Sequence, residues 1–440
     1  MVLTGRAASI ALLAVLPIAV SNRPATVFVV CLAALSAAIG VDIALAGKLT
    51  ALRFSHSAPS SIRLGEPVDV TLQVRNDGRR RIRGAVREAW PPSAVATPRV
   101  HRIDCSPGGS TTLMTRLHPV RRGDLHCATL AVRAIGPLGL AGRQRSMAAA
   151  AGVRVLPPFL SRKHLPSRLA RLRDIDGQIP VLVRGQGTEF DSLREYVPGD
   201  DVRSIDWRAT ARRADVVVRT WRPERDRRVV IVLDTGRTSA GRVGLDPTGG
   251  DPSGWPRLDW SLDAALLLAA LASRAGDHVD LLAHDRVTRA AVFGARRSEL
   301  LADLVEAMAP LEPALLESDS PSMVAAVRGR VRRRALVVLL TDLNASALEE
   351  GLLPVLPQLS SRHKVIVAAV TDPRVRELAT GRADAAEVYD AAAAERALGE
   401  RRVIAARLRM GGVEVVDAAP EELAPALADR YLAMKAGGKL

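Results

Sequence analysis

Two apolar stretches open the chain, at residues 7–20 and 25–46. The first carries no charge, and the second carries only Asp42. The second stretch has 22 residues, enough for the roughly 30 Å hydrocarbon core of a bilayer at a helical rise of about 1.5 Å per residue. The first is short for a span, so the core of a signal peptide is the alternative. Because no small-residue cleavage site follows Val20, we expect a transmembrane hairpin in residues 1–48, with helices at about 5–20 and 25–46.

The pattern changes to short alternating segments after residue 50. Residues 68–74 alternate apolar and polar side chains and end at Asn76-Asp77-Gly78, which is typical of a strand followed by a turn. Further strands are predicted at residues 111–117, 128–133 and 153–156, separated by proline and glycine. Residues 50–157 therefore predict a β-sandwich domain of the immunoglobulin-like type.

Unbroken aliphatic runs alternate with helical patterns in residues 229–440. The runs lie at 229–233, 335–340 and 365–370, with shorter ones at 279–283 and 413–416. The helical stretches are 258–275, 298–308, 323–331, 385–409 and 421–435. Buried parallel strands are aliphatic throughout because both faces of their sheet are covered. We therefore expect a multidomain protein that ends in a doubly wound, Rossmann-like α/β domain.

The formal charge is +15, and most of the excess lies just after the apolar stretches. Residues 48–160 hold 18 Arg and Lys against 6 Asp and Glu. Such a surface suits the anionic headgroups of a cytoplasmic leaflet, whereas no recognisable motif predicts nucleic-acid binding. Arg23 alone lies between the apolar stretches, while Arg6 precedes them and Lys48 and Arg53 follow. The positive-inside rule thus predicts a multi-pass protein with cytoplasmic soluble domains.

The three cysteines are too few for a disulfide-stabilised secreted scaffold. In a reducing cytoplasm Cys105 and Cys127 would be free thiols, whereas cleavage of the first stretch and a reversed orientation would allow a bridge between them. A zinc site could be imagined from His101, Cys105, His118, His126 and Cys127. Their spacing lacks a C-x-x-C pair, so we expect no zinc there.

Three aspartates follow the aliphatic runs directly, namely Asp234, Asp342 and Asp372. Ligands of open α/β sheets bind at the carboxyl ends of the strands, and hard cations prefer oxygen ligands. A divalent-cation site with Asp234, Thr238 and Asp342 as ligands is therefore predicted, for Mg²⁺ or a similar ion. The alternative is that these aspartates cap helices or turns.

The loop after the first run, Asp234-Thr235-Gly236-Arg237-Thr238-Ser239, resembles the D-x-S-x-S metal-adhesion loop of von Willebrand factor A domains. Thr341-Asp342 resembles the later aspartate loop of those domains. Gly236 departs from the pattern, because the motif has its first serine there, which makes the predicted site degenerate. A middle-loop hydroxyl would come from Ser318, Ser320 or Ser322.

Residues 161–228 form a densely charged, linker-like segment. Its part from 184 to 226 contains no histidine, so we expect Arg–carboxylate pairs that fix a loop rather than a catalytic pair. The segment carries the pattern G-x-E-F-x-x-L-R-x-Y-x-x-G-D-D-x-R-x-I-D-W-x-x-T-A-R. Its positions are Gly187, Glu189, Phe190, Leu193, Arg194, Tyr196, Gly199, Asp200, Asp201, Arg203, Ile205, Asp206, Trp207, Thr210, Ala211 and Arg212.

This pattern resembles the signature of "domain of unknown function" family 58, bacterial proteins similar to von Willebrand factor A domains. The order of apolar helices, β-domain and α/β domain is also similar to that family's layout. The resemblance implies a partner rather than a reaction, because such proteins are associated with MoxR-type AAA+ ATPases in the assembly or maturation of protein complexes. It also implies the inner membrane of a bacterial cell.

The expected function is thus that of a membrane-anchored protein-interaction adaptor. A structural protein of the cell envelope and a metal-dependent hydrolase are the alternatives. The chain lacks Walker A, H-E-x-x-H and G-x-S-x-G patterns, so the sequence favours a protein that is not an enzyme.

Overall fold

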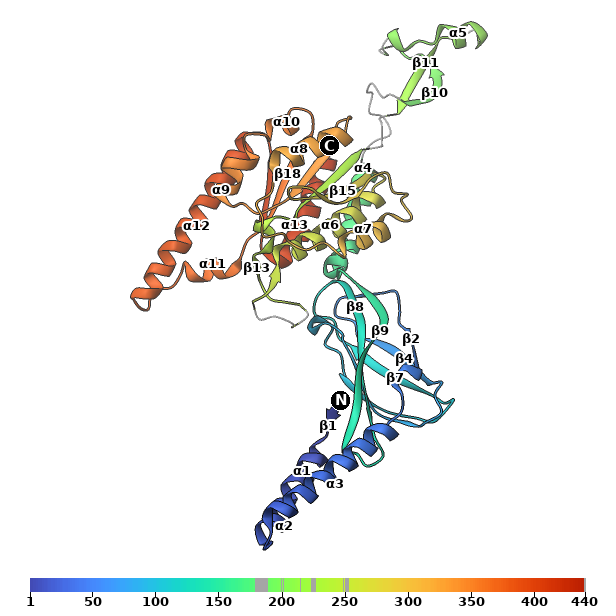
Figure 1. Ribbon diagram of the computed structural model, residues 1–440. Coiled ribbons are helices and arrows are strands. Elements are labelled where there is room, and N and C mark those ends of the chain that lie inside the picture. The colour runs from blue at the N-terminus through green and yellow to red at the C-terminus, as the bar shows by residue number, and fades with distance from the viewer. Residues whose placement is uncertain are drawn as a thin grey trace. The chain divides into compact units, whose positions relative to one another are not determined.

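The chain folds into two compact units, Met1–Leu156 and Pro157–Leu440 (Figure 1). This computed structural model describes residues 1–178, 189–198, 200, 202–213, 215–222, 227–247, 249 and 253–438. The first unit contains the apolar N-terminus and the β-domain, and the second contains the α/β domain.

The apolar N-terminus forms α1 (Gly5–Leu13), α2 (Val15–Val20) and α3 (Pro24–Leu45), and α1 and α2 pack along α3. Proline at the start of α3 costs no hydrogen bond, because the first amides of a helix have no intrahelical partner. Among the described residues, α3 is the one helix long and apolar enough to cross a membrane. Its exposed apolar side chains include Phe28, Val29, Val30, Leu32 and Val41.

The β-domain consists of two sheets with alternating buried and exposed side chains. One sheet has the order β1-β9-β8-β5-β6, with β3 beside β9, and the other has the order β2-β4-β7. The strands are β1 (Val2–Leu3), β2 (Leu52–Ser57), β3 (Ser61–Arg63), β4 (Val68–Asn76), β5 (Ile82–Glu88), β6 (Val100–Cys105), β7 (Ser110–Leu117), β8 (Gly123–Ile135) and β9 (Ala141–Leu156). The predicted strands at 68–74, 111–117, 128–133 and 153–156 are confirmed. The N-terminal β1 pairs with β9 and so belongs to this domain.

The α/β domain is built on a six-stranded sheet of order β16-β15-β12-β17-β18-β19. All neighbours are parallel except β15 and β16. The strands are β12 (Arg228–Asp234), β15 (His278–His284), β16 (Thr288–Val292), β17 (Leu336–Leu340), β18 (Lys364–Val370) and β19 (Glu414–Ala418). The aliphatic runs identified in the sequence coincide with the parallel strands, so that prediction is confirmed.

Helices cover both faces of this sheet. One face packs against α6 (Arg257–Arg274) and α13 (Pro420–Ala436). The other packs against α8 (Ser320–Arg330), α10 (Pro357–Ser360) and the C-terminal half of α12 (Ala385–Met410). The remaining helices are α7 (Leu300–Met308), α9 (Ala345–Ala347) and α11 (Pro373–Leu378).

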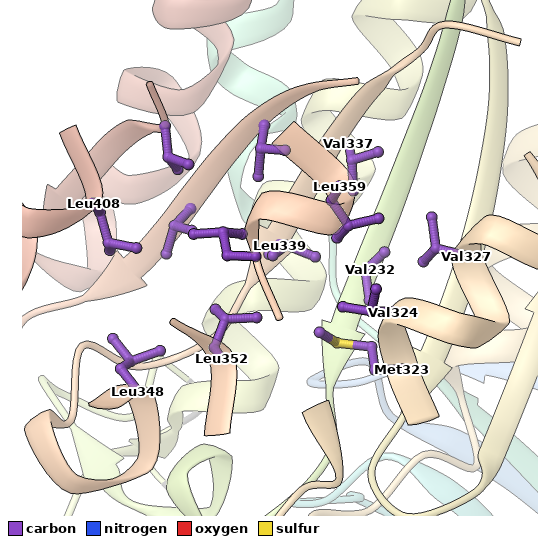
Figure 2. Close-up of a cluster of buried hydrophobic side chains, with 14 of the residues drawn as sticks. Val232, Met323, Val324, Val327, Val337, Leu339, Leu348, Leu352, Leu359 and Leu408 are labelled. Carbon is purple, nitrogen blue, oxygen red and sulfur yellow. The ribbon is translucent and has the colours of Figure 1, made fainter. Parts of the chain in front are cut away.

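A cluster of buried aliphatic side chains fills the space between the sheet and α8, α10 and α12 (Figure 2). Val232 of β12 and Leu339 of β17 point into it, together with Met323 and Val327 of α8 and Leu408 of α12. Alternate residues of the same strands face α6 and α13, because successive side chains of a strand point to opposite faces. The core therefore fixes the carboxyl ends of β12 and β17 side by side.

The charged, linker-like segment at residues 161–228 contains regular elements. It includes α4 (Leu165–Gln178), β10 (Glu189–Glu195), α5 (Trp207–Arg213) and β11 (Val217–Arg222). β10 and β11 form an antiparallel pair. Its Arg194–Asp200 and Arg219–Asp206 ion pairs are of the kind expected from the sequence.

Candidate functional site

A cavity of about 240 Å³ opens at the carboxyl ends of β12 and β17. Its apolar part is continuous with the core through Val232, Met323 and Leu339. A π-helix at Leu348–Leu352 forms another part of the wall, and such helices occur frequently at functional sites. The polar lining residues are Asp234, Arg237, Thr238, Glu317, Ser318, Ser320, Thr341, Asn344, Ser346 and Glu350.

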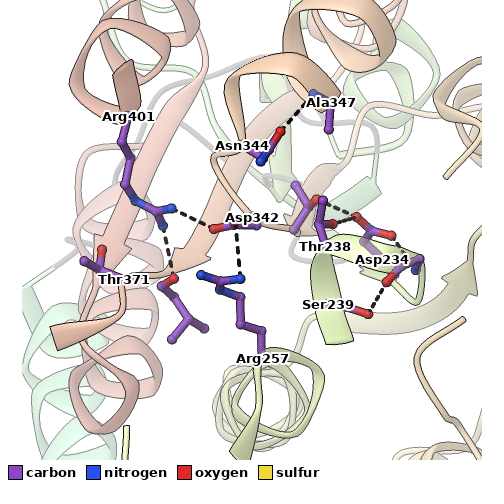
Figure 3. Close-up of polar contacts among 12 residues, drawn as sticks. Asp234, Thr238, Ser239, Arg257, Asp342, Asn344, Ala347, Thr371 and Arg401 are labelled. Carbon is purple, nitrogen blue, oxygen red and sulfur yellow. Dashed lines mark hydrogen bonds and ion pairs between the residues drawn. The ribbon is translucent and has the colours of Figure 1, made fainter. Parts of the chain in front are cut away.

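Asp234 is the centre of a hydroxyl cluster at this cavity (Figure 3). Its Oδ2 accepts hydrogen bonds from Thr238 at 3.1 Å and from Thr341 at 2.6 Å. Its Oδ1 accepts one from Ser318 at 2.5 Å and one from the Gly236 amide at 2.8 Å. Asp234 is 9% exposed, so these bonds compensate a carboxylate that is largely removed from water.

Ser318 provides the middle-loop hydroxyl, and Gly236 makes room for it. A Cβ atom at residue 236 would lie 2.0 Å from the Ser318 Oγ. The serine hydroxyl thus occupies the space that the first serine side chain of the resembled motif would need. Of the other two candidates, Ser320 begins α8 and lines the same cavity, whereas Ser322 contacts the buried His284 at 3.3 Å.

The hydroxyl cluster, Asp234 with Thr238, Ser318 and Thr341, has the oxygen–oxygen distances of hydrogen bonds, which are close to those between the ligands of a small cation. Neighbouring ligand oxygens of an octahedral Mg²⁺ ion are about 2.9 Å apart, because each lies about 2.0–2.1 Å from the metal. The three oxygen–oxygen distances here are 2.5, 2.6 and 3.1 Å. The described residues hold no group of three or more His, Cys, Asp or Glu side chains suited to a metal. The hydroxyl cluster thus offers a hard cation one carboxylate and three hydroxyls as oxygen ligands.

Asp342, the third predicted ligand, forms ion pairs with arginines and does not belong to the hydroxyl cluster. Its carboxylate contacts Arg401 at 2.7 Å and Arg257 at 3.6 Å (Figure 3). Arg401 also donates to both carboxylate oxygens of Asp417. Burial disfavours the charge of Arg401, but the hydrogen bond to Asp417 and the two nearby carboxylates outweigh it and raise the pKa of Arg401. Arg401 thus links the carboxyl ends of β17, β18 and β19 through Asp342, the Val370 carbonyl and Asp417.

Asp372, which follows β18, caps a helix as the alternative reading expected. It accepts a hydrogen bond from the Arg374 amide at 3.0 Å, at the start of α11. Carboxylates at this position satisfy amides that have no intrahelical partner. Of the three aspartates at the strand ends, Asp234 alone therefore faces the hydroxyl cluster.

The signature residues stabilise the β10–β11 pair through local contacts. Arg194 bonds Asp200 at 2.7 Å, and Arg219 bonds Asp206 at 2.8 Å. The hydrogen bond from Arg219, together with the amides at the start of α5, lowers the pKa of Asp206. Trp207 leaves 66% of its surface exposed. The signature positions Gly187, Gly199 and Asp201 lie outside the described residues.

Three of the imagined zinc ligands of the β-domain, His101, Cys105 and Cys127, form hydrogen bonds with other groups. His101 contacts the Thr115 hydroxyl at 2.7 Å, and Cys105 contacts Thr111 at 3.0 Å. Cys105 and Cys127 are both buried free thiols. Burial raises the pKa of Cys127, which makes this thiol a weak nucleophile.

Sequence reasoning did not find Arg257, Arg401 and Asp417. Each lies far along the chain from Asp342, and no local pattern joins an arginine within a helix to an aspartate at a strand end. The available signal was Arg401, which lies on the apolar face of α12. A buried guanidinium requires a carboxylate, so this position indicates an ion pair.

Comparisons with known proteins give relatives of unassigned activity. The chain is 28% identical over 200 residues to the uncharacterized protein Rv1480 of Mycobacterium tuberculosis and equally to the uncharacterized protein Mb1516 of Mycobacterium bovis. The match covers 45% of this chain and spans 59% of the length of these relatives.

Two solved structures show only weak likeness. The CARDB domain of the PF1109 protein from Pyrococcus furiosus, in complex with di-metal ions, is 12% identical with a TM-score of 0.20, covering 25% of this chain and 94% of that one. The PilB minor pilin from Streptococcus sanguinis is 10% identical with a TM-score of 0.31, covering 88% and 78%. Neither score establishes a shared fold.

A family model also matches part of the chain. It matches residues 192–410, which include most of the signature, the hydroxyl cluster and the Asp342–Arg401 pair. The part of the chain from β10 to the end of α12 is thus similar to the family described as "Protein of unknown function DUF58".

Proposed function

We propose that this protein is a membrane-anchored protein-interaction adaptor whose α/β edge binds a partner through a divalent cation. The observation that carries the proposal is the convergence of three hydroxyls on the Asp234 carboxylate. One carboxylate leaves a bound Mg²⁺ with net positive charge, so a carboxylate of the partner would complete its ligand shell. This is the mode expected from the resemblance to von Willebrand factor A domains, despite the glycine at 236.

The lining of the cavity favours binding over catalysis. Among the described residues it contains no His, Cys or Lys, the side chains that most often act as bases or nucleophiles besides carboxylates. Ser318 donates to Asp234, but no histidine lines the cavity with it. We therefore propose an adaptor that is not itself an enzyme. The resemblance suggests a MoxR-type AAA+ ATPase as partner, in assembly or maturation of protein complexes.

The proposed anchor is a hairpin of α1, α2 and α3 that crosses the bacterial inner membrane twice. The pairing of β1 with β9 supports it, because this pairing places the start of α1 beside the β-domain that follows α3. Removal of the first helix as a signal peptide would also remove that strand. The arginine and lysine distribution supports a cytoplasmic location of the soluble domains.

Co-purification of the full chain from solubilised membranes tests this function. We would compare magnesium with EDTA and identify bound proteins by mass spectrometry, using the wild type, Asp234→Asn and the control Asp372→Asn. Asp372 ends a strand of the same sheet, and asparagine keeps its cap. We expect an AAA+ ATPase with magnesium for the wild type and the control, and its loss with EDTA or with Asp234→Asn. Recovery unchanged by EDTA and Asp234→Asn would refute the metal contact, and the absence of any partner would refute the adaptor.

A further inference from the structure

Asp42 is a buried carboxylate inside the apolar helix α3. It is 0% exposed and lies three residues before the helix ends at Leu45. Its oxygens accept hydrogen bonds from the amides of Leu138, Leu140 and Ala141 at 2.7, 2.7 and 2.8 Å. These amides belong to the turn at residues 136–141, which joins β8 to β9. The charge within the apolar segment is therefore satisfied by the β-domain.

The sequence of this turn is adapted to the contact. A Cβ atom at Gly136 would lie 2.2 Å from the Asp42 Oδ1, and Gly139 has a φ of +72°. The hydroxyl of Thr4, which precedes α1, donates to the Gly139 carbonyl at 2.6 Å. Both ends of the helical hairpin thus hold the same turn.

The contact with Asp42 fixes the position of this turn along the axis of the helical hairpin. Asp42 lies about 5 Å before the end of α3, at about 1.5 Å per residue. If α3 spans the bilayer, the turn reaches the boundary between headgroups and acyl chains. Leu138 at the turn exposes 50% of its surface, although it is apolar and its own amide is held by Asp42. An exposed leucine at this depth would face lipid rather than water.

Arginines surround the same end of α3. Arg80 donates to the Ala44 carbonyl at 2.5 Å, and Arg143 donates to the Ile43 carbonyl at 3.2 Å. The Arg6 guanidinium lies beside Gly139. Among the described residues, none of these three arginines forms an ion pair with a carboxylate. Because a guanidinium has five N–H donors, Arg80 and Arg143 retain donors for an anion.

We propose that this face of the β-domain is a docking surface for anionic phospholipid headgroups. Leu138 inserts at the headgroup boundary, and Arg6, Arg80 and Arg143 bind lipid phosphates. Charge complementarity supports this partner, since guanidinium groups bind phosphate through paired hydrogen bonds and residues 48–160 are strongly basic. The inference rests on the membrane anchor within the proposed function, and it adds a lipid contact by the soluble β-domain.

Fluorescence quenching in reconstituted vesicles tests the insertion of Leu138. The full chain is labelled with a thiol-reactive fluorophore at Cys31 of α3, or at Leu138→Cys or Met114→Cys after Cys31→Ala. Cys105 and Cys127 are buried and escape labelling. Met114 is 58% exposed in the middle of β7, so it is a matched apolar control. The vesicles contain phosphatidylcholine and phosphatidylglycerol in equal parts, with a quencher on the acyl chains.

We expect strong quenching at residues 31 and 138 and little at 114. Quenching at 31 without quenching at 138 would overturn the docking surface and leave the anchor intact. No quenching at 31 would overturn the anchor itself, and with it this inference.

The role of Arg80 and Arg143 is tested by measuring which lipids remain bound to the purified protein. Native mass spectrometry would measure the ratio of phosphatidylglycerol to phosphatidylcholine on the purified full chain. Arg80→Gln with Arg143→Gln should lower this ratio about 25-fold, because each arginine near an anionic surface contributes about fivefold. The control pair, Arg87→Gln with Arg102→Gln, changes exposed arginines of β5 and β6 and should leave the ratio unchanged. Equal ratios in the two double variants would overturn the role of Arg80 and Arg143.

Discussion

Because of Asp263, we expect the free energy of unfolding of the α/β domain to decrease as the pH rises. This residue of α6 is 5% exposed, and its carboxylate accepts a hydrogen bond from the Ser161 amide at 3.0 Å. Burial raises its pKa to about 6, and the contacts with Ser161 only partly oppose this effect. Because burial outweighs the hydrogen bonds to its carboxylate, Asp263 is harder to ionise in the folded state than in the unfolded chain.

The sign and size of the effect follow from this shift. Between pH 4 and pH 6 the folded state holds a proton that the unfolded state has released, so the free energy of unfolding decreases as the pH rises. A shift of about two units corresponds to about 3 kcal/mol lost above pH 6. Asp263→Asn cannot ionise, and its amide oxygen can still accept from Ser161. The variant should thus gain up to about 3 kcal/mol relative to the wild type at pH 7 and little at pH 4.

Urea unfolding of the full chain, followed by tryptophan fluorescence from pH 4 to pH 8, measures this difference. The control is Asp303→Asn, which changes an exposed carboxylate in the first turn of α7. The stability difference between Asp263→Asn and the wild type should rise through pH 5 and level off above pH 6, while the control stays flat. A difference that is independent of pH, or that grows toward acid, would refute the reasoning.

Two further predictions concern buried contacts. Lys435→Met removes the cation that bonds Asp277 at 2.9 Å. It should destabilise the protein by about 3 kcal/mol in urea unfolding, because the buried carboxylate loses its cationic partner and keeps the hydrogen bond from Tyr431. Gly136→Ala places a Cβ atom 2.2 Å from the Asp42 Oδ1, and it should increase hydrogen exchange of the turn at residues 136–141. Gly40→Ala in α3, where nothing lies within 4 Å of the added atom, should leave that exchange unchanged.

The fold could be predicted where the physical cause is local. The unbroken aliphatic runs at β12, β17 and β18 arise because both sheet faces are covered, and the alternation in β4 arises because one face is exposed. The candidate site depends on long-range pairing instead. Ser318 lies 84 positions from Asp234, and Arg401 lies 59 positions from Asp342. The pattern of apolar and polar residues does not show which hydroxyl or arginine contacts each aspartate. Those contacts depend on how loops and helices are placed in the fold.

The different environments of Thr341 and Asp342 explain why the hydroxyl cluster has a single carboxylate. Consecutive side chains at the end of a strand point to opposite sides. Thr341 bonds Asp234, and Asp342 bonds Arg401 and Arg257 instead. Turning Asp342 toward Asp234 would leave two arginines without this carboxylate and would place two carboxylates together, which costs free energy unless a cation separates them. A cation at Asp234 would therefore take its second negative charge from the other carboxylates of the cavity wall, Glu317 and Glu350, or from the proposed partner.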